Sequence, residues 1–294
     1  MYIRELFEKK KLVFSFEVFP PKNTSPVKSI YTALNELKEL NPDFISVTYG
    51  AGGSCTDNKT AEISSLIKNV YGIESIAHLT CIGQNKENID FIKERLKLEG
   101  IENILALRGD NNGKLEVKDF QYASNLMEHL KDEFNIIGAC YPEGHIENKG
   151  IDLEIDNMLL KEECGCTSFI SQLFFSNEEY YDFLEKVRNR GVKAPIQAGI
   201  MPVINKKQIE RIGNLCGAKI PRKFKKIMEK YEYNKDALRE AGIAYAVEQI
   251  IDLSSSNVEG IHLYTMNNPY VAKKIKENIK TVIEAVNGKE IVYE

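Results

Sequence analysis

Ionisable side chains lie within, or directly after, short apolar segments of the sequence. Glu17 is inside SFEVFPP and His78 is inside AHLTCIG. Arg108 and Asp110 flank a glycine directly after the apolar run LAL. A carboxyl group held among apolar neighbours favours its neutral form, which suits general acid catalysis. A nearby aspartate can oppose a positive charge that develops during a reaction. These residue types therefore indicate an enzyme site.

Other polar residues also lie near the ends of apolar runs: Thr48, Tyr49, Thr80, Tyr141, Gln172, Tyr264, Thr265 and Asn267. Each ionisable residue alone has a simpler interpretation. Glu17 fits an ion-paired structural carboxylate, His78 fits a core histidine, and Arg108 fits a partner for Asp110. Their shared placement at segment ends favours one common site, but it identifies neither a substrate nor a cofactor.

Short segments rich in β-forming residues alternate with longer segments of helical periodicity. We expect strands at Val13–Phe19, Asp43–Thr48, Ile76–Ile82, Asn103–Arg108, Ile136–Tyr141, Ser168–Phe174, Pro195–Met201 and Gly260–Met266. We expect helices at Pro26–Leu40, Asn58–Val70, Asn85–Leu98, Asp119–Lys131 and Glu178–Arg190. An extra helix is expected around Pro221–Lys230, because Lys206–Leu253 is longer than one crossover.

This alternation predicts parallel strands joined by helical crossovers, and at 294 residues it favours closure into a (β/α)8 TIM barrel of the α/β class. The alternative is a doubly wound open sheet, which is weakened because no Gly-x-Gly-x-x-Gly follows the first strand. No linker-like segment divides the chain, so we expect one catalytic domain over residues 1–294. In a barrel, the polar strand ends would meet at one face.

Composition excludes several classes of protein. The formal net charge of −4 argues against nucleic acid as the main ligand. The basic cluster Arg222, Lys223, Lys225 and Lys226 is interpreted as the solvated face of a helix. No segment approaches the ~20 apolar residues that span a bilayer, so we expect no membrane insertion.

The N-terminal segment lacks the features of a secretory signal and is expected to form a short helix, with Leu6 and Phe7 covering the bottom of the core. The six cysteines show no metal-site spacing and are interpreted as free thiols of a cytoplasmic protein, with no metal.

Eight short segments are distributed in order over nearly the whole chain: FSFEVFPPK, SVTYGAGGS, HLTCIG, LALRGD, YPEGH, QLFF, GIMPV and LYTMN. In these segments and in their order the chain resembles the methylenetetrahydrofolate reductase family. The resemblance implies a barrel that holds a non-covalent flavin, usually FAD, with FMN as the alternative. It implies hydride transfer from flavin N5 to the methylene of 5,10-methylenetetrahydrofolate, giving 5-methyltetrahydrofolate, with NAD(P)H as the donor.

Roles follow from the matching positions. Glu17 matches the general acid that helps to protonate folate N10, and Asp110 matches the residue that stabilises the resulting iminium cation. The resemblance assigns folate contacts to Glu17, Asp110, Gln172, Gln208 and Tyr264. It assigns flavin contacts to Thr48, Tyr49, Ala51, His78, Arg108, Gly109, Asp110, Ala123, Tyr141, His145, Asn157 and Lys161.

Four positions depart from the family pattern. Lys206 and Ile212 replace aromatic residues near the expected nicotinamide site, Leu160 replaces a basic residue, and Asn268 replaces a folate-contacting arginine. These departures leave a second interpretation open, in which the chain is the flavin subunit of a larger complex that receives electrons from an iron–sulfur partner. A third is a flavin- or folate-binding scaffold without turnover. A homo-oligomer is also expected.

Overall fold

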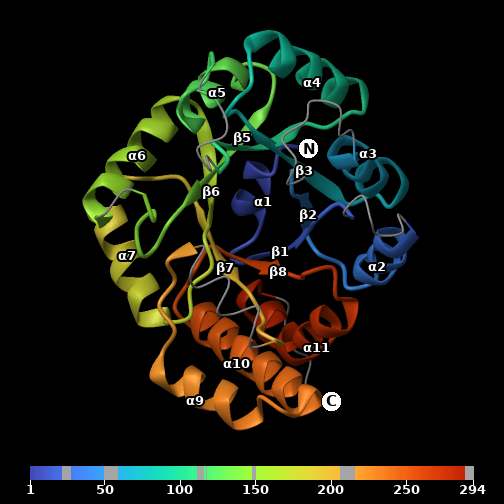
Figure 1. The fold of residues 1–294 in the computed structure, drawn as a ribbon, viewed down its shortest axis with the longest axis vertical. Helices are drawn as coiled ribbons and strands as arrows, with labels where there is room; N and C mark the ends of the chain where they lie inside the picture. The colour runs from blue at the N-terminus through green and yellow to red at the C-terminus, as the bar shows by residue number, and fades with distance from the viewer. Residues whose placement is uncertain are drawn as a thin grey trace.

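The computed structural model describes residues 1–21, 28–49, 59–110, 116, 118–147, 150–205 and 216–288. Within them, eight parallel strands close into a barrel in sequence order (Figure 1). The strands are β1 (Val13–Val18), β2 (Phe44–Val47), β3 (Glu74–Thr80), β4 (Asn103–Leu107), β5 (Asn135–Cys140), β6 (Cys166–Ser171), β7 (Ile196–Ile200) and β8 (Gly260–Tyr264). The closed barrel confirms the expected fold and excludes the doubly wound sheet.

Helices form a ring around the barrel in Figure 1. They are α1 (Arg4–Lys9), α2 (Lys28–Lys38), α3 (Lys59–Ser65), the π-helical turn η1 (Leu66–Val70), α4 (Lys86–Leu98), α5 (Ala123–Leu130), α6 (Ile151–Glu163), α7 (Asn177–Asn189), α9 (Arg222–Tyr231), α10 (Lys235–Ser255) and α11 (Pro269–Val286). The extra helix is therefore confirmed as α9, and its basic side chains are exposed while Phe224 and Met228 are buried. No helix of the described residues combines the length and apolarity needed to cross a membrane.

Several expected boundaries differ from the observed ones by a few residues, and two of these differences have identifiable reasons. The helix expected from Asp119 begins at Ala123, because the Asp119 carboxylate instead accepts a hydrogen bond from the Lys86 backbone N–H at 2.7 Å, at the start of α4. The strand expected to run to Phe174 ends at Ser171. Gln172 therefore lies just beyond β6, where its side-chain oxygen accepts a hydrogen bond from the Leu173 N–H at 2.9 Å.

Side chains of β1 alternate between two environments. Phe14, Phe16 and Val18 belong to the large apolar core between the strands and the helices. Val13, Ser15 and Glu17 therefore face the barrel interior, as the period of two in a strand requires. The interior changes along the axis, from the apolar Val13 layer toward the polar residues near the strand C-termini.

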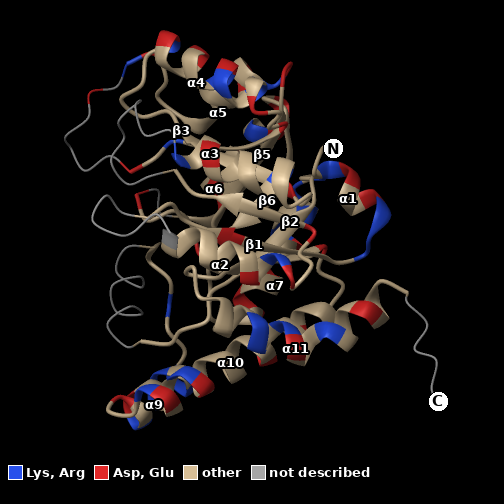
Figure 2. Cartoon of the chain, turned by 90° about the vertical axis from the view of Figure 1, so that its right-hand side faces the viewer, with Lys and Arg blue, Asp and Glu red and all other residues tan. Residues whose placement is uncertain are grey.

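Helix α1 closes the N-terminal end of the barrel, and Figure 2 shows it at one end of the molecule. Leu6 is buried in a cluster with inward-facing residues of the strands, including Val13 and Phe44, and Phe7 packs against that cluster. This arrangement confirms the expected role of Leu6 and Phe7. It also leaves the opposite end of the barrel as the mouth.

The first and last strands are joined by side chains as well as by the sheet. Thr265 Oγ1 donates a hydrogen bond to the Glu17 carbonyl at 2.6 Å. The Asn267 amide accepts from the Phe19 N–H at 3.0 Å and donates to the Phe19 carbonyl at 2.8 Å. These contacts anchor the end of β1, and with it Glu17, to the segment after β8.

Gly242 allows α10 to pack directly on the chain after β7. A Cβ atom added at this position would lie 1.7 Å from the Val203 carbonyl oxygen, which is backbone and cannot rotate away. Gly242 is buried in the interior of the helix. By helix propensity alone, alanine at this position would stabilise the protein by about 1 kcal/mol. The steric clash with the Val203 carbonyl opposes this gain and therefore decides whether the substitution stabilises or destabilises the fold.

We expect Gly242→Ala to lower the free energy of unfolding by about 2 kcal/mol or more, as overpacking a fixed backbone contact requires. Urea unfolding followed by circular dichroism measures this effect. The matched control is Ala244→Gly, on the exposed side of the same helix, for which propensity alone predicts a loss of about 1 kcal/mol. A stabilised Gly242→Ala variant would contradict the close approach of α10.

Candidate active site

Glu17 lies at the mouth between two histidines. Its Oε2 atom is 3.6 Å from His78 Nε2 on β3 and 3.7 Å from His262 Nε2 on β8. The Glu17 side chain is 19% exposed, so it is partly accessible rather than fully buried as the apolar strand suggested. A carboxyl group in this position can exchange a proton with a ligand at the mouth while its other surroundings remain protein.

His78 is buried and electrically neutral at neutral pH. Burial lowers its pKa to about 4, although the nearby Glu17 carboxylate acts in the opposite direction. Its Nε2 atom makes no hydrogen bond within the described part of the chain. The structure thus places the predicted site residue His78 with its neutral imidazole facing the Glu17 carboxylate, while its predicted flavin contact stays a prediction.

His262 was not singled out from the sequence. It lies in the segment IHLY, where it looks like one residue of a buried strand. Its only sequence signal is the alternation that places it on the same face as Tyr264, two positions along β8. The structure buries it completely beside Glu17.

Tyr264 spans the barrel near the mouth. Its hydroxyl donates a hydrogen bond to the Ser171 carbonyl at 2.7 Å, across from β8 to the end of β6. Gly199 on β7 makes room for the ring, since a Cβ there would lie 2.8 Å from the phenol oxygen. Burial raises the pKa of Tyr264 well above its ordinary value, with the Glu17 charge acting in the same direction. The phenol is thus a fixed, neutral wall of the site.

A second group of predicted residues lies after β4 and β5. Arg108 forms an ion pair with Glu147 at 2.6 Å. The sequence alone suggested Asp110 as the partner of Arg108, but among the described residues Arg108 pairs with Glu147. Asp110 is exposed. Tyr141 packs edge-on against His145, with ring centroids 4.6 Å apart.

The electrostatics of this group follow from burial and positive charge. Burial raises the pKa of Tyr141, with the Glu154 charge as a further cause. Burial and the Arg108 charge lower the pKa of His145. Both groups are therefore neutral at neutral pH, beside the cationic Arg108.

One face of α6 contributes Glu154, Asn157 and Lys161, which are spaced to lie on the same side of the helix. The Lys161 ammonium donates to the Ala139 carbonyl at 2.7 Å, near the end of β5, and lies 3.9 Å from Glu154. Glu154 was not predicted. Burial raises its pKa to about 7, and Lys161 only partly offsets this effect. Its Oε1 atom has no hydrogen-bond partner among the described residues.

Some predicted residues lie at the mouth with roles in the fold. The Thr48 carbonyl accepts from Thr60 Oγ1 at 3.0 Å, and Ala123 begins α5 and packs on the core. Asn268, which stands in place of a family arginine, caps the N-terminus of α11. Tyr49 is half-buried and packs against the main core.

Several predicted positions lie outside the described residues: Ala51, Lys206, Gln208 and Ile212. The predicted contacts of Ala51 and Gln208 therefore remain predictions. Of the cysteines, the five in the described ranges have free thiols. Within those ranges no group of three or more histidine, cysteine, aspartate or glutamate side chains is placed to hold a metal ion.

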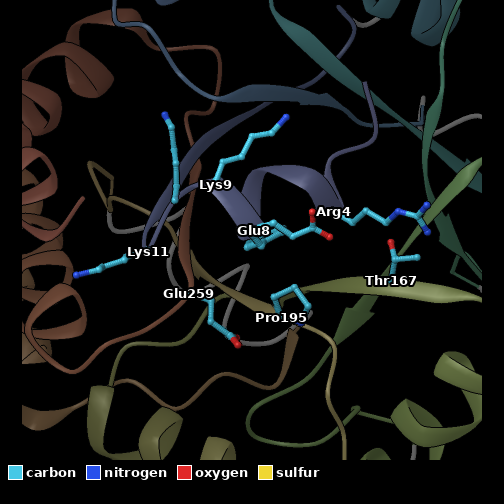
Figure 3. A pocket seen from close by; sticks show the side chains of 9 residues that line it. Arg4, Glu8, Lys9, Lys11, Thr167, Pro195 and Glu259 are labelled. Carbon is cyan, nitrogen blue, oxygen red and sulfur yellow. The ribbon is translucent and has the colours of Figure 1, made fainter. Parts of the chain in front are cut away.

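A cavity of about 590 Å³ lies at the other end of the barrel. Figure 3 shows the side chains that line it, which come from α1 and from the N-terminal ends of strands; Arg4, Glu8, Lys9, Lys11, Thr167, Pro195 and Glu259 are labelled there. Glu259 is held by Arg188 at 2.7 Å. Because active sites of such barrels lie at the C-terminal ends of the strands, this cavity is not the candidate site.

The chain is similar to reductases of one-carbon metabolism. A family model described as methylenetetrahydrofolate reductase matches residues 2–280. The sequence is 33% identical over 301 residues to a methylenetetrahydrofolate reductase (NADH) 1 of Arabidopsis thaliana, covering 96% of this chain and 51% of that protein. It is 33% identical over 258 residues to the 5,10-methylenetetrahydrofolate reductase of Escherichia coli (strain K12), covering 86% of each chain. The chain therefore spans about half the length of the plant relative.

Solved structures share the fold at low sequence identity. An uncharacterized protein from Clostridium thermocellum, which binds two copies of 5-methyl-5,6,7,8-tetrahydrofolic acid, has a TM-score of 0.67 at 15% identity and covers 97% of this chain and 100% of its own. Tryptophan synthase from M. tuberculosis has a TM-score of 0.53 at 9% identity, covering 97% of this chain and 96% of its own. At such identities the likeness concerns the barrel alone.

The buried Glu154 predicts a stability that falls as pH rises. The unfolded carboxyl ionises near 4.5 and the folded one near 7, so between these values the folded state keeps a proton that the unfolded state has lost. Stability is then lost as pH rises through this window. Glu154→Gln should remove this pH dependence. Between about pH 4.5 and pH 8, the free energy of unfolding of the variant should therefore rise relative to that of wild type by roughly 3 kcal/mol.

Chemical denaturation at both pH values measures the difference. Glu163→Gln, an exposed substitution on the same helix, is the control for the change of net charge. Parallel stability curves for Glu154→Gln and wild type across this pH range would contradict the buried-carboxyl interpretation.

Proposed function

The chain belongs to the methylenetetrahydrofolate reductase family, and from this premise we propose that it reduces 5,10-methylenetetrahydrofolate to 5-methyltetrahydrofolate. The observation that carries the proposal is the placement of Glu17 at the barrel mouth, with Oε2 3.6 Å and 3.7 Å from two imidazole nitrogens. This reaction needs an acid for folate N10, and a partly exposed carboxyl among protein groups suits that task.

We infer that the cofactor is a flavin, with FAD favoured over FMN, held by the ends of β4 and β5 and by α6. The residues there fit such a group. Arg108 and Lys161 provide positive charge for phosphates. The buried Oε1 of Glu154, which pairs with Lys161 at 3.9 Å but accepts no hydrogen bond from the described residues, fits a ligand hydroxyl donor. Gly109 has a φ of +88° and a Cβ there would lie 3.0 Å from the Ile82 side chain, so only glycine fits this turn beside Asp110.

The remaining flavin contacts stay as predictions: Thr48, Tyr49, Ala51, His78, Asp110, Ala123, Tyr141, His145 and Asn157. A bound flavin supplies the hydride for the folate methylene. The part of the protein is to bind, orient and stabilise charge. Neutral Tyr141 adds no negative charge that would compete with a bound anion for Arg108 and Lys161.

The proton step belongs to Glu17. Its carboxyl gives a proton to folate N10, while the bond between N10 and the methylene carbon breaks and its electron pair stays on N10. The methylene carbon is left in an iminium cation on N5, and the exposed Asp110 carboxylate opposes that positive charge. Gln172 and Tyr264 bound the folate side of the mouth, and Gln208 remains a predicted contact outside the described residues.

NAD(P)H is the proposed electron donor, consistent with the names of the plant relatives. The second candidate is delivery of electrons by an iron–sulfur partner protein. The departures that favour it are the loss of aromatic residues at Lys206 and Ile212, outside the described residues, together with Leu160 in place of a basic residue, 46% exposed on α6. Stacking of a nicotinamide contributes roughly 0.5–1.5 kcal/mol, so the substitutions at Lys206 and Ile212 alone would weaken NADH binding only about tenfold.

The purified protein should be yellow, and 5-methyltetrahydrofolate should bleach its flavin under anaerobic conditions by the reverse reaction. Release by heating, followed by chromatography, identifies FAD or FMN. Stopped-flow mixing with micromolar NADH or NADPH tests the donor. Rapid bleaching rejects the partner-dependent reading, whereas slow bleaching accelerated by a co-purifying protein supports it. A colourless protein that binds neither flavin on reconstitution would refute the proposed function.

Glu17→Gln should lower the rate of the folate half-reaction about 10²–10⁴-fold, because a positioned acid is lost. Flavin content and flavin reduction by the donor should stay near wild type, since that half-reaction needs no acid on the folate. Glu36→Gln, an exposed substitution on α2, is the matched control. Wild-type folate turnover in Glu17→Gln would remove Glu17 from the mechanism.

A further inference from the structure

Below Glu17, the barrel interior holds a group of buried polar side chains that the proposed reaction does not use. Ser15, Ser46 and His262 are fully buried and Gln197 is 1% exposed. Burying such groups is unfavourable unless each is hydrogen-bonded. Their arrangement is specific, because Gly260 leaves the space that Gln197 fills; a Cβ at Gly260 would lie 2.7 Å from Gln197 Cγ.

The hydrogen bonds assign the protonation of His262. Gln197 Nε2 donates to Ser15 Oγ at 3.1 Å. Ser15 Oγ lies 2.7 Å from His262 Nδ1, but 3.4 Å from the Ile261 carbonyl. Because the Ile261 carbonyl is the more distant acceptor, the Ser15 hydroxyl makes its stronger hydrogen bond by donating to Nδ1, which favours the tautomer with its hydrogen on Nε2.

The Nε2–H group of His262 then faces two acceptors. One is Ser46 Oγ at 3.2 Å and the other is Glu17 Oε2 at 3.7 Å. The ring itself cannot turn freely, because Phe44 stacks on it at 5.9 Å and Tyr264 packs edge-on at 5.5 Å between centroids. The distance to Glu17 exceeds a hydrogen bond, and such contacts commonly tighten when a ligand binds.

We propose that His262, fixed as its Nε2–H tautomer by Ser15 and Gln197, is a positioning residue that directs the acidic proton of Glu17 toward the mouth. This inference rests on the proposed folate reduction. With Oε2 facing the donor on His262, the proton of the neutral Glu17 carboxyl resides on Oε1. When that proton moves to folate N10, the carboxylate formed gains a charge-assisted hydrogen bond at Oε2.

The same contacts show that His262 is not a proton relay. The chain of hydrogen bonds runs from His262 through Ser15 to Gln197, which also lies 3.5 Å from the Val13 carbonyl. It ends at the apolar layer closed by α1, and within the described part of the chain it reaches no group that could take up a proton from solvent. Glu17 therefore exchanges its proton only at the mouth, and His262 acts on rate rather than on proton supply.

His262→Asn and His262→Gln form a discriminating pair. The longer glutamine amide can place an N–H near the former Nε2 position, whereas asparagine cannot. For the asparagine variant we expect a roughly 10–100-fold slower folate half-reaction, the effect of losing one hydrogen bond to a charged group. Its folate dissociation constant and its flavin reduction by the donor should match wild type. The glutamine variant should recover most of the rate.

Glu17→Gln provides the second arm. In that background, His262→Asn should cause no further loss, since the proton it positions is already absent. His129→Asn is the matched control, because this histidine pairs with Asp90 on the outside of the barrel at 2.7 Å. Thermal unfolding establishes that each variant is folded. Should His262→Asn unfold, Ser15→Ala tests the same inference through the tautomer and should slow the same half-reaction.

The inference is overturned if His262→Asn turns over folate at the wild-type rate, if glutamine restores nothing, or if the asparagine loss is undiminished in Glu17→Gln. It is supported by a loss confined to the folate half-reaction and rescued by glutamine. A wild-type protein without any folate turnover would instead refute the proposed function, so the two failures are distinguishable.

Discussion

The closed barrel forces side chains from every strand into one narrow interior from which water is largely excluded. A polar group placed there destabilises the fold unless its hydrogen bonds are made by other inward-facing groups. The interior satisfies this constraint by a gradient, with an apolar layer against α1 and the contacts of Ser15, Gln197 and His262 above it. Glu17 lies above these residues, at the mouth. Because the polar groups beneath Glu17 make hydrogen bonds to one another, its carboxyl remains available to a ligand at the mouth.

Two ionisable groups in this region have pKa values shifted by the same cause, burial, in opposite chemical directions. His78 is held neutral down to about pH 4, and Glu154 holds its proton up to about pH 7. Neither pKa shift stabilises the folded state, because burial removes from each group the hydration that stabilises its charged form. Strongly shifted groups gather where ligands bind; His78 lies beside Glu17 on β3, and Glu154 lies beside Lys161 on α6.

The strands were predictable because each is a short apolar run between turn-forming residues, and the period of two placed Glu17 and Tyr264 on the inward face. Register between distant strands was not predictable. Nothing in IHLY indicates that His262 would lie beside Ser15, since that pairing arises only when β8 closes on β1. Glu154 was missed for a related reason: its helix has charged residues on several faces, and only the docking of α6 on β5 selects the buried one. Asn267 was correctly expected just after the last strand, whereas Gln172 was expected inside the sixth strand and lies just beyond it. The hydrogen bonds of both side chains to backbone groups could not be foreseen.

The anchoring of Glu17 by Thr265 and Asn267 has a consequence for biosynthesis. Glu17, the proposed general acid, is synthesised about 250 positions before residues 262–267, which carry the groups that fix its backbone and face its carboxyl. Early strands can pair as they emerge, but contacts of such long sequence separation form slowly and late. A nascent chain therefore carries the acid in an unorganised state throughout elongation, and the site first exists when the final strand closes the barrel.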